Sequence, residues 1–194
     1  MPSGPMSLPN VITLARILLI PVFVLTYLGP WAWSYLATAV LFGLAAATDW
    51  LDGYLARRLD QTTPFGAFLD PVADKLIVVT ALVLLIAHHA SIWLTLPALV
   101  IVGREIVISA LREWMAEMNL SVAVAVSLLG KIKTTLQMIA IAVLLANPPV
   151  PDSVWVMIGY VLIYVAAFMT LWSMSVYLAA AWPMLRDSSQ KGVK

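Results

Sequence analysis

Six long apolar segments, separated by short polar or proline-containing stretches, account for most of this chain. A helix needs about 20 apolar residues to cross the hydrocarbon core of a bilayer. The six segments are Val11–Leu28, Trp31–Leu59, Ala67–Ala87, Ile92–Met115, Gly130–Ala146 and Val154–Trp182. Between the second and third we expect a loop over Asp60–Phe65, because Thr62, Thr63 and Pro64 favour turns. The pattern predicts an all-α polytopic membrane protein with six transmembrane helices, forming one domain over residues 1–194.

The composition supports this fold class and excludes several functions. Of the 194 residues, 62% are hydrophobic and 11% are charged, whereas a soluble domain has roughly 25% charged residues. The net charge of +1 gives no reason to expect a nucleic-acid partner. The absence of cysteine excludes disulfides, thiolate metal sites and cysteine nucleophiles. The N-terminal residues lack the basic region of a signal peptide, so we expect the first apolar segment to remain as a span.

The distribution of basic residues predicts the orientation in the membrane. The connections at residues 29–30, 88–91 and 147–152 contain no lysine or arginine, and the basic residues lie at or near the other ends of the segments. Since cytoplasmic loops carry the excess of positive charge, we expect both termini on the cytoplasmic side. The acidic stretch Asp49–Asp74 would lie on that side too.

Four aspartates mark the end of the second segment and the start of the third. They are Asp49, Asp52, Asp70 and Asp74. The members of each pair lie three or four residues apart, so each pair shares one face of a helix. Four like charges near a bilayer need neutralisation, and two divalent cations would supply it. Carboxylate oxygens favour Mg²⁺ or Mn²⁺ over Zn²⁺. The alternative is that these carboxylates cap helices or pair with nearby basic residues.

Two metal ions held side by side suit phosphoryl transfer, because they bridge phosphate oxygens and stabilise the leaving group. Small residues at Gly53 and Ala56 leave room for a ligand to approach the backbone, and Arg57 offers a bidentate phosphate contact.

A phosphorylated acceptor would need further cations. The candidates are Arg104, Arg112, Lys131 and Lys133. Their alternative role is to set topology or to contact anionic lipid headgroups.

The acidic stretch resembles the signature of a known family, the CDP-alcohol phosphotransferases. The matching pattern is Asp49-x2-Asp52-Gly53-x2-Ala56-Arg57-x8-Gly66-x3-Asp70-x3-Asp74, with all eight fixed positions present. The resemblance implies that Asp49, Asp52 and Asp70 are metal ligands, and that Asp74 is both a shared ligand and the general base. It also implies a homodimer with six spanning helices.

The same resemblance assigns the residues that contact the cytidine diphosphate group. They are Asn10, Thr13, Gly53, Arg57 and Thr63. Residues 69–75, 103–114 and 130–137 are further similar to bacterial members that use CDP-diacylglycerol and sn-glycerol 3-phosphate and release CMP. This implies a bacterial cytoplasmic membrane location, with the active site facing the cytoplasm. The sixth segment adds nothing to the resemblance.

Other functions remain open on the residues alone. Within the family, the acceptor could instead be serine or inositol phosphate. An intramembrane prenyltransferase also uses two aspartate-rich helix ends with Mg²⁺. A divalent cation transporter would use the carboxylates as its transport site.

Among the acidic residues near the basic set, Glu105 is expected to pair with a neighbouring cation.

Overall fold

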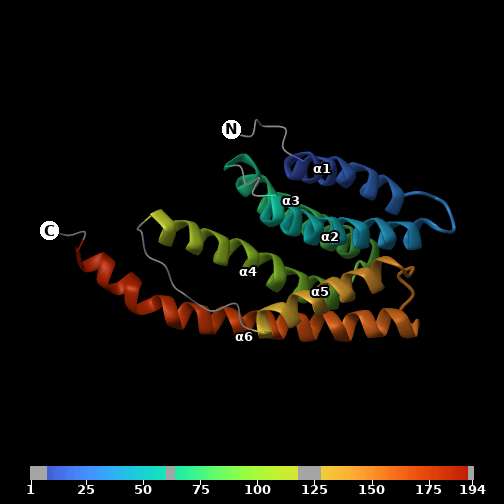
Figure 1. The fold of residues 1–194 in the computed structure, drawn as a ribbon. Helices are drawn as coiled ribbons and strands as arrows, with labels where there is room; N and C mark the ends of the chain where they lie inside the picture. The colour runs from blue at the N-terminus through green and yellow to red at the C-terminus, as the bar shows by residue number, and fades with distance from the viewer. Residues whose placement is uncertain (1–7, 60–63, 118–127, 192–194) are drawn as a thin grey trace. The chain divides into compact units, whose positions relative to one another are not determined.

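The computed structural model describes residues 8–59, 64–117 and 128–191, and near several helix ends it describes the backbone alone. These ranges form six α-helices and their connections (Figure 1). The helices are α1 (Leu8–Tyr27), α2 (Ser34–Leu59), α3 (Pro64–His89), α4 (Ile92–Glu117), α5 (Leu128–Leu145) and α6 (Val154–Lys191). The all-helical fold class is therefore confirmed for the described residues.

The helix boundaries differ from the predicted segments in two informative places. Helix α3 begins at Pro64, so the predicted loop over Asp60–Phe65 is wrong at its last two residues. Proline is favoured in the first turn of a helix, because its missing N–H would have no partner there. Helix α6 continues beyond Trp182 to Lys191. Membrane thickness limits the apolar part of a helix, and polar residues with good helix propensity extend it into water.

Three stretches are long and apolar enough to cross a membrane: Pro71–His89, Ile92–Met115 and Val154–Ala179. Three shorter apolar helical stretches, Val11–Tyr27, Ser34–Thr48 and Ile132–Leu145, fall below that length among the residues searched. The chain is thus a helical membrane protein. The count of six spans stays a prediction.

The chain divides into two compact units. The first unit comprises Met1–Ala90 with Ile141–Ile158, and the second comprises Ser91–Ala140 with Gly159–Lys194. The single domain expected from the sequence is not tested by this division and stays a prediction.

In the first unit, α1 packs against α2 and α3. An aromatic cluster joins the three helices at one end of the unit. The Tyr27 ring lies 4.8 Å from the His88 ring and 5.6 Å from the Tyr35 ring, centroid to centroid. Because α1, α2 and α3 alternate in direction, the start of α1, the end of α2 and the start of α3 share the opposite end of this unit (Figure 1). The connections therefore bring both aspartate pairs to one end of the first unit.

In the second unit, α4 buries one side of the helix. Its buried apolar residues recur at spacings of three, four and seven: Leu94, Ala98, Ile101, Ile108 and Met115. Glu105 and Arg112 continue the same series, since each lies four residues after one member and three before the next. The polar members of this series consequently face the same side as the buried core.

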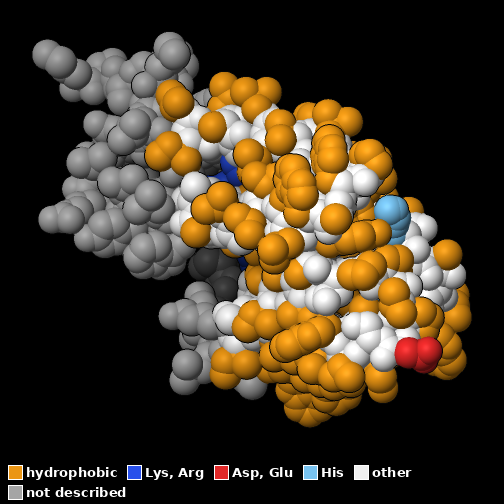
Figure 2. Space-filling model, turned by 90° about the vertical axis from the view of Figure 1, so that its right-hand side faces the viewer, with side chains coloured by type: hydrophobic (Ala, Val, Ile, Leu, Met, Phe, Trp, Pro, Cys, Tyr) orange, Lys and Arg blue, Asp and Glu red, His pale blue; other side chains and the backbone are white. Residues whose placement is uncertain are grey.

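The described surface is strongly apolar. Large hydrophobic side chains stay exposed along all six helices, and Figure 2 shows one face on which hydrophobic side chains predominate. Tryptophans near helix ends, such as Trp31, Trp93 and Trp155, are 49–65% exposed. Such tryptophans are typical of the boundary between lipid and water, so this surface suits a bilayer rather than water.

Candidate functional site

An ion pair joins α1 to α3 in the first unit. Arg16 Nη1 donates to Asp74 Oδ1 at 2.7 Å, between residues 58 positions apart. The Arg16 side chain is 2% exposed and the Asp74 side chain is 46% exposed. A buried guanidinium therefore holds a carboxylate that is about half exposed. Charge-assisted hydrogen bonds of this length are the stronger kind, so the orientation of Asp74 depends on α1.

Thr13 lies one helical turn before Arg16 and is fully buried. Residues three apart share a helix face, so Thr13 and Arg16 lie on the side of α1 that packs within the first unit. Asn10 lies one further turn toward the start of α1, and only its backbone is described.

The other predicted metal ligands can be placed only by their backbone. Asp49 and Asp52 lie in the last three turns of α2, and Asp70 lies one turn before Asp74 in α3. The side chains of Asp49, Asp52 and Asp70 lie outside the described residues, so the metal site stays a prediction. Among the side chains that are described, no group of three or more His, Cys, Asp or Glu could hold a metal ion.

Several other predicted contacts also lie outside the described side chains. Gly53, Arg57 and Lys131 are helical in backbone, and Thr63 lies in the connection between α2 and α3, outside the described residues. Their assignment to CDP or to the acceptor stays a prediction.

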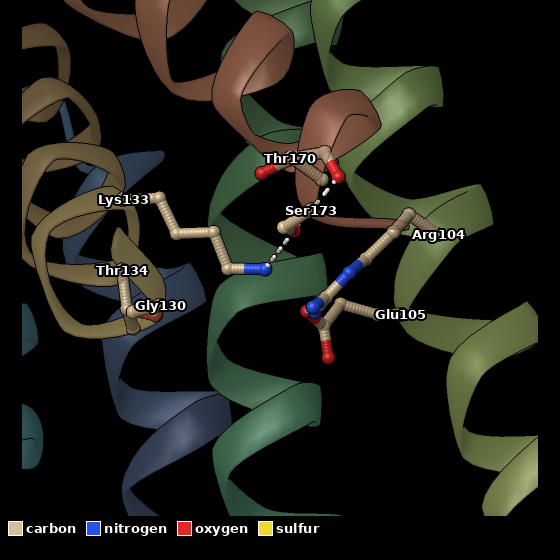
Figure 3. A network of polar contacts seen from close by, with 7 residues as sticks. All are labelled: Arg104, Glu105, Gly130, Lys133, Thr134, Thr170 and Ser173. Carbon is tan, nitrogen blue, oxygen red and sulfur yellow. Dashed lines mark hydrogen bonds and ion pairs between the residues drawn. The ribbon is translucent and has the colours of Figure 1, made fainter. Parts of the chain in front are cut away.

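The basic residues expected to bind the acceptor belong to the second unit. Lys133 of α5 is 6% exposed, and its Nζ donates to Ser173 Oγ of α6 at 2.7 Å. Ser173 Oγ in turn donates to the Thr170 carbonyl oxygen at 3.0 Å. Figure 3 shows Lys133 and Arg104 extending from α5 and α4 toward one another, with Ser173 beside the lysine ammonium. The structure thus places the Lys133 and Arg104 side chains near one another, and Ser173 of α6 contacts the lysine.

Arg104 and Arg112 each have a defined neighbour. Arg104 Nη1 pairs with Glu105 Oε1, which confirms that Glu105 pairs with a neighbouring cation. The Arg112 guanidinium lies over the Tyr177 ring, 6.0 Å from its centroid. Both arginines and Glu105 interact electrostatically with Lys133. Three cations and one carboxylate therefore share one region of the second unit, which leaves net positive charge for an anionic ligand.

Sequence reasoning missed three of these contacts. Arg16 is a lone cation within an otherwise apolar stretch, three residues after Thr13, and this position marks it as a functional candidate. Thr170, Ser173 and Tyr177 recur at spacings of three and four within an apolar helix. In the sixth segment, these regularly spaced polar residues were the signal from which contacts to the basic residues could have been predicted.

The fold of the described residues is all-helical with three stretches apolar enough to span a membrane, and the aspartate-rich helix ends and the basic residues are its two candidate sites. The model of the CDP-alcohol phosphatidyltransferase family matches residues 6–172. The chain belongs to this family.

Relatives match over nearly their whole length. A Pseudomonas fluorescens protein named CDP-diacylglycerol–glycerol-3-phosphate 3-phosphatidyltransferase is 56% identical over 190 residues, covering 97% of each chain. Proteins of the same name from Escherichia coli strain K12 and Shigella flexneri serotype 5b are each 54% identical over 182 residues. These two alignments cover 93% of this chain and 98% of the relative. All three are similar to this chain from end to end, so both the acidic stretch and the basic cluster fall within the matched region.

Proposed function

We propose that this chain transfers the phosphatidyl group from CDP-diacylglycerol to sn-glycerol 3-phosphate, giving phosphatidylglycerophosphate and CMP. The observation that carries the proposal is the similarity, at 54–56% identity over nearly the full length, to relatives that bear the name of this activity. Membership of the CDP-alcohol phosphatidyltransferase family agrees with it.

On the donor side, the proposal assigns Asp49, Asp52, Asp70 and Asp74 to two divalent metal ions, Mg²⁺ or Mn²⁺. The donor set fits such ions, because it consists of carboxylate oxygens and Asp74 is half-exposed rather than sealed in the core. When bound, the ions would offset the phosphate charge that develops on the departing CMP. Asn10, Thr13, Gly53, Arg57 and Thr63 would contact the cytidine diphosphate group.

Asp74 would act as the general base. The acceptor hydroxyl oxygen bonds to the phosphorus that carries the diacylglycerol, the bond from that phosphorus to CMP breaks, and the hydroxyl proton passes to Asp74. A carboxylate that acts as a base must be within hydrogen-bond reach of that proton and must keep a fixed orientation toward it. The contact of 2.7 Å from the buried Arg16 supports this role, because it fixes the orientation of a carboxylate whose side chain is 46% exposed.

On the acceptor side, Arg104, Arg112, Lys131 and Lys133 would bind the phosphate of sn-glycerol 3-phosphate. A phosphate dianion needs fixed cations and hydrogen-bond donors. The convergence of Arg104, Arg112 and Lys133 in the second unit supports the assignment. A neutral acceptor alcohol would offer these cations no anionic group to bind.

The oligomeric state, the topology and the location are proposed on the same basis, the similarity to the family. We infer a homodimer of six-span subunits in the bacterial cytoplasmic membrane, with both termini and the active site on the cytoplasmic side. The single domain would include both units. The exposed apolar side chains along the helices support residence in lipid.

An assay with three acceptors tests the function. Purified protein in mixed micelles receives CDP-diacylglycerol with labelled sn-glycerol 3-phosphate, serine or inositol phosphate, each with and without a chelator. We expect label in lipid from glycerol phosphate alone, with release of CMP and loss of activity under the chelator. Incorporation of serine alone would overturn the acceptor assignment, and transfer that persists in the chelator would overturn the metal role.

A further inference from the structure

Helix α6 carries a polar stripe within a long apolar segment. Thr170, Ser173 and Tyr177 lie three and four residues apart, so they share one helix face. Thr170 is 2% exposed, and the other two contact basic side chains from α5 and α4. A polar stripe inside an apolar helix is disfavoured in lipid unless it has partners. The contacts identify those partners as the cations of the second unit.

The hydroxyl of Ser173 is oriented by two hydrogen bonds. Its proton is donated to the Thr170 carbonyl oxygen at 3.0 Å, so its oxygen presents a lone pair to the Lys133 ammonium at 2.7 Å (Figure 3). A serine hydroxyl has one proton and two lone pairs. Because the proton is already used, Ser173 acts toward Lys133 as an acceptor only. The hydroxyl therefore sets the direction in which the lysine extends.

Lys133 needs such an acceptor. Its side chain is almost fully buried, and the positive charges of Arg104 and Arg112 act on it against the single negative charge of Glu105. A buried ammonium without an acceptor is strongly disfavoured, and neighbouring cations add to this. Without Ser173 the ammonium would turn toward another acceptor and leave its present position.

Tyr177 serves Arg112 in a comparable way. The guanidinium lies 6.0 Å from the ring centroid, within the range of a cation–π contact. The Tyr177 hydroxyl contacts Met115 Sδ at 3.9 Å, which holds the ring against α4. Because the Arg112 side chain is exposed, the contact with the ring limits the positions that the guanidinium can take.

From these contacts we propose that α6 is the positioning element of the acceptor-phosphate site, with Ser173 holding Lys133 and Tyr177 holding Arg112. This rests on the proposed function, since it takes Lys133 and Arg112 as the groups that bind the acceptor phosphate. In this proposal Ser173 and Tyr177 act through Lys133 and Arg112 rather than on the substrate directly. Both are positioning residues that determine how well a phosphorylated alcohol is bound.

The decisive experiment compares Ser173→Ala with Ser173→Thr and a matched control. Ser175 supplies the control, because its hydroxyl makes the same kind of bond to the Trp172 carbonyl oxygen at 2.8 Å but is exposed and contacts no lysine in the described structure. We expect Ser173→Ala to raise the KM for glycerol 3-phosphate about tenfold, the loss expected when a hydrogen bond to a charged group is removed. Its kcat and its KM for CDP-diacylglycerol should stay within about twofold, because the donor site is untouched.

Four variants complete the test. Ser173→Thr should restore the KM, because it keeps the hydroxyl, and Ser175→Ala should match the parent chain. Tyr177→Leu should raise the same KM, whereas Tyr177→Phe should raise it less, because it keeps the ring and loses only the hydroxyl contact to Met115. An unchanged or lowered KM in Ser173→Ala would overturn the proposal, and so would an equal rise in Ser175→Ala.

The outcomes separate this proposal from the function on which it rests. If the parent chain transfers nothing to glycerol 3-phosphate, the proposed function fails first. If the parent is active and Lys133→Ala raises the KM for glycerol 3-phosphate while Ser173→Ala does not, the function stands and the role of α6 is wrong.

Discussion

Replacing Asp74 by asparagine would separate two roles of one carboxylate. In the folded protein Asp74 Oδ1 accepts a hydrogen bond from Arg16 Nη1 at 2.7 Å, and the Arg16 side chain is 2% exposed. Asparagine keeps the size and one acceptor oxygen but removes the negative charge and the basic site. We therefore expect Asp74→Asn to abolish turnover and, as a separate effect, to lower the free energy of unfolding.

The structure bounds the second effect. Removing one partner of a fully buried ion pair costs about 3–5 kcal/mol, whereas exposed pairs contribute about 0–1 kcal/mol. Here Arg16 is buried and the Asp74 side chain is 46% exposed, so water screens the carboxylate from one side. An intermediate coupling of about 1–2 kcal/mol follows. Loss of a general base alone reduces turnover by about 10²–10⁴-fold.

A double-mutant cycle measures the coupling directly. Asp74→Asn, Arg16→Met and the double variant are unfolded by a denaturant series in mixed micelles, with a chelator present so that metal binding does not contribute. CMP release is measured in parallel with Mg²⁺. We expect Arg16→Met to retain some turnover, reduced by up to about a hundredfold through misplacement of Asp74.

The control is Asp152→Asn, which alters an exposed aspartate in the turn before α6 and should leave both measurements unchanged. Additive stability effects, within about 0.3 kcal/mol, would refute the ion pair as a stabilising contact. Turnover above a tenth of the parent value in Asp74→Asn would refute its role as the base.

Three further predictions concern other parts of the chain. Tyr27→Phe should leave the unfolding free energy unchanged or raise it by up to about 1 kcal/mol, because the buried Tyr27 hydroxyl has no hydrogen-bond partner in the described structure; a loss above 1 kcal/mol in a denaturant series would contradict this. Ala90→Gly should raise the thermal unfolding midpoint, because Ala90 has a φ of 44° after α3, where alanine pays about 1 kcal/mol that glycine avoids; a lowered midpoint would count against it. Treatment with a chelator should stop CMP release reversibly, with activity returning on addition of Mg²⁺ and helical circular dichroism unchanged throughout; activity that survives dialysis against the chelator would exclude the metal ions.

The order and extent of the helices were predictable because the bilayer imposes a length. Apolar segments must approach its thickness, so their ends are marked by composition. The second predicted segment and α2 both end at Leu59, and the fourth segment and α4 both begin at Ile92. The start of α3 differs from the prediction, because proline is common in loops and also suits the first turn of a helix.

The candidate site was only partly predictable, for a different reason. The aspartates are close in sequence, so helix periodicity places each pair on a face. The contacts that position the candidate site residues Asp74 and Lys133 join residues distant in sequence: Arg16 and Asp74 are 58 residues apart, and Lys133 and Ser173 are 40 apart. Such pairs depend on how the helices pack, and no local pattern specifies them. Lone polar residues within apolar segments were the local feature of the sequence that indicated such contacts.

The separation between Lys133 and Ser173 has a consequence for synthesis of the chain. Helix α5 emerges from the ribosome with its lysine about two to eight seconds before the serine of α6, at 5–20 residues per second over 40 residues. During that interval the ammonium has no serine acceptor and must stay near headgroups or water. Insertion of α6 therefore supplies the hydrogen-bond acceptor that Lys133 uses in the folded protein. A chain released before α6 would lack Ser173, the hydrogen-bond acceptor that Lys133 contacts in the folded protein.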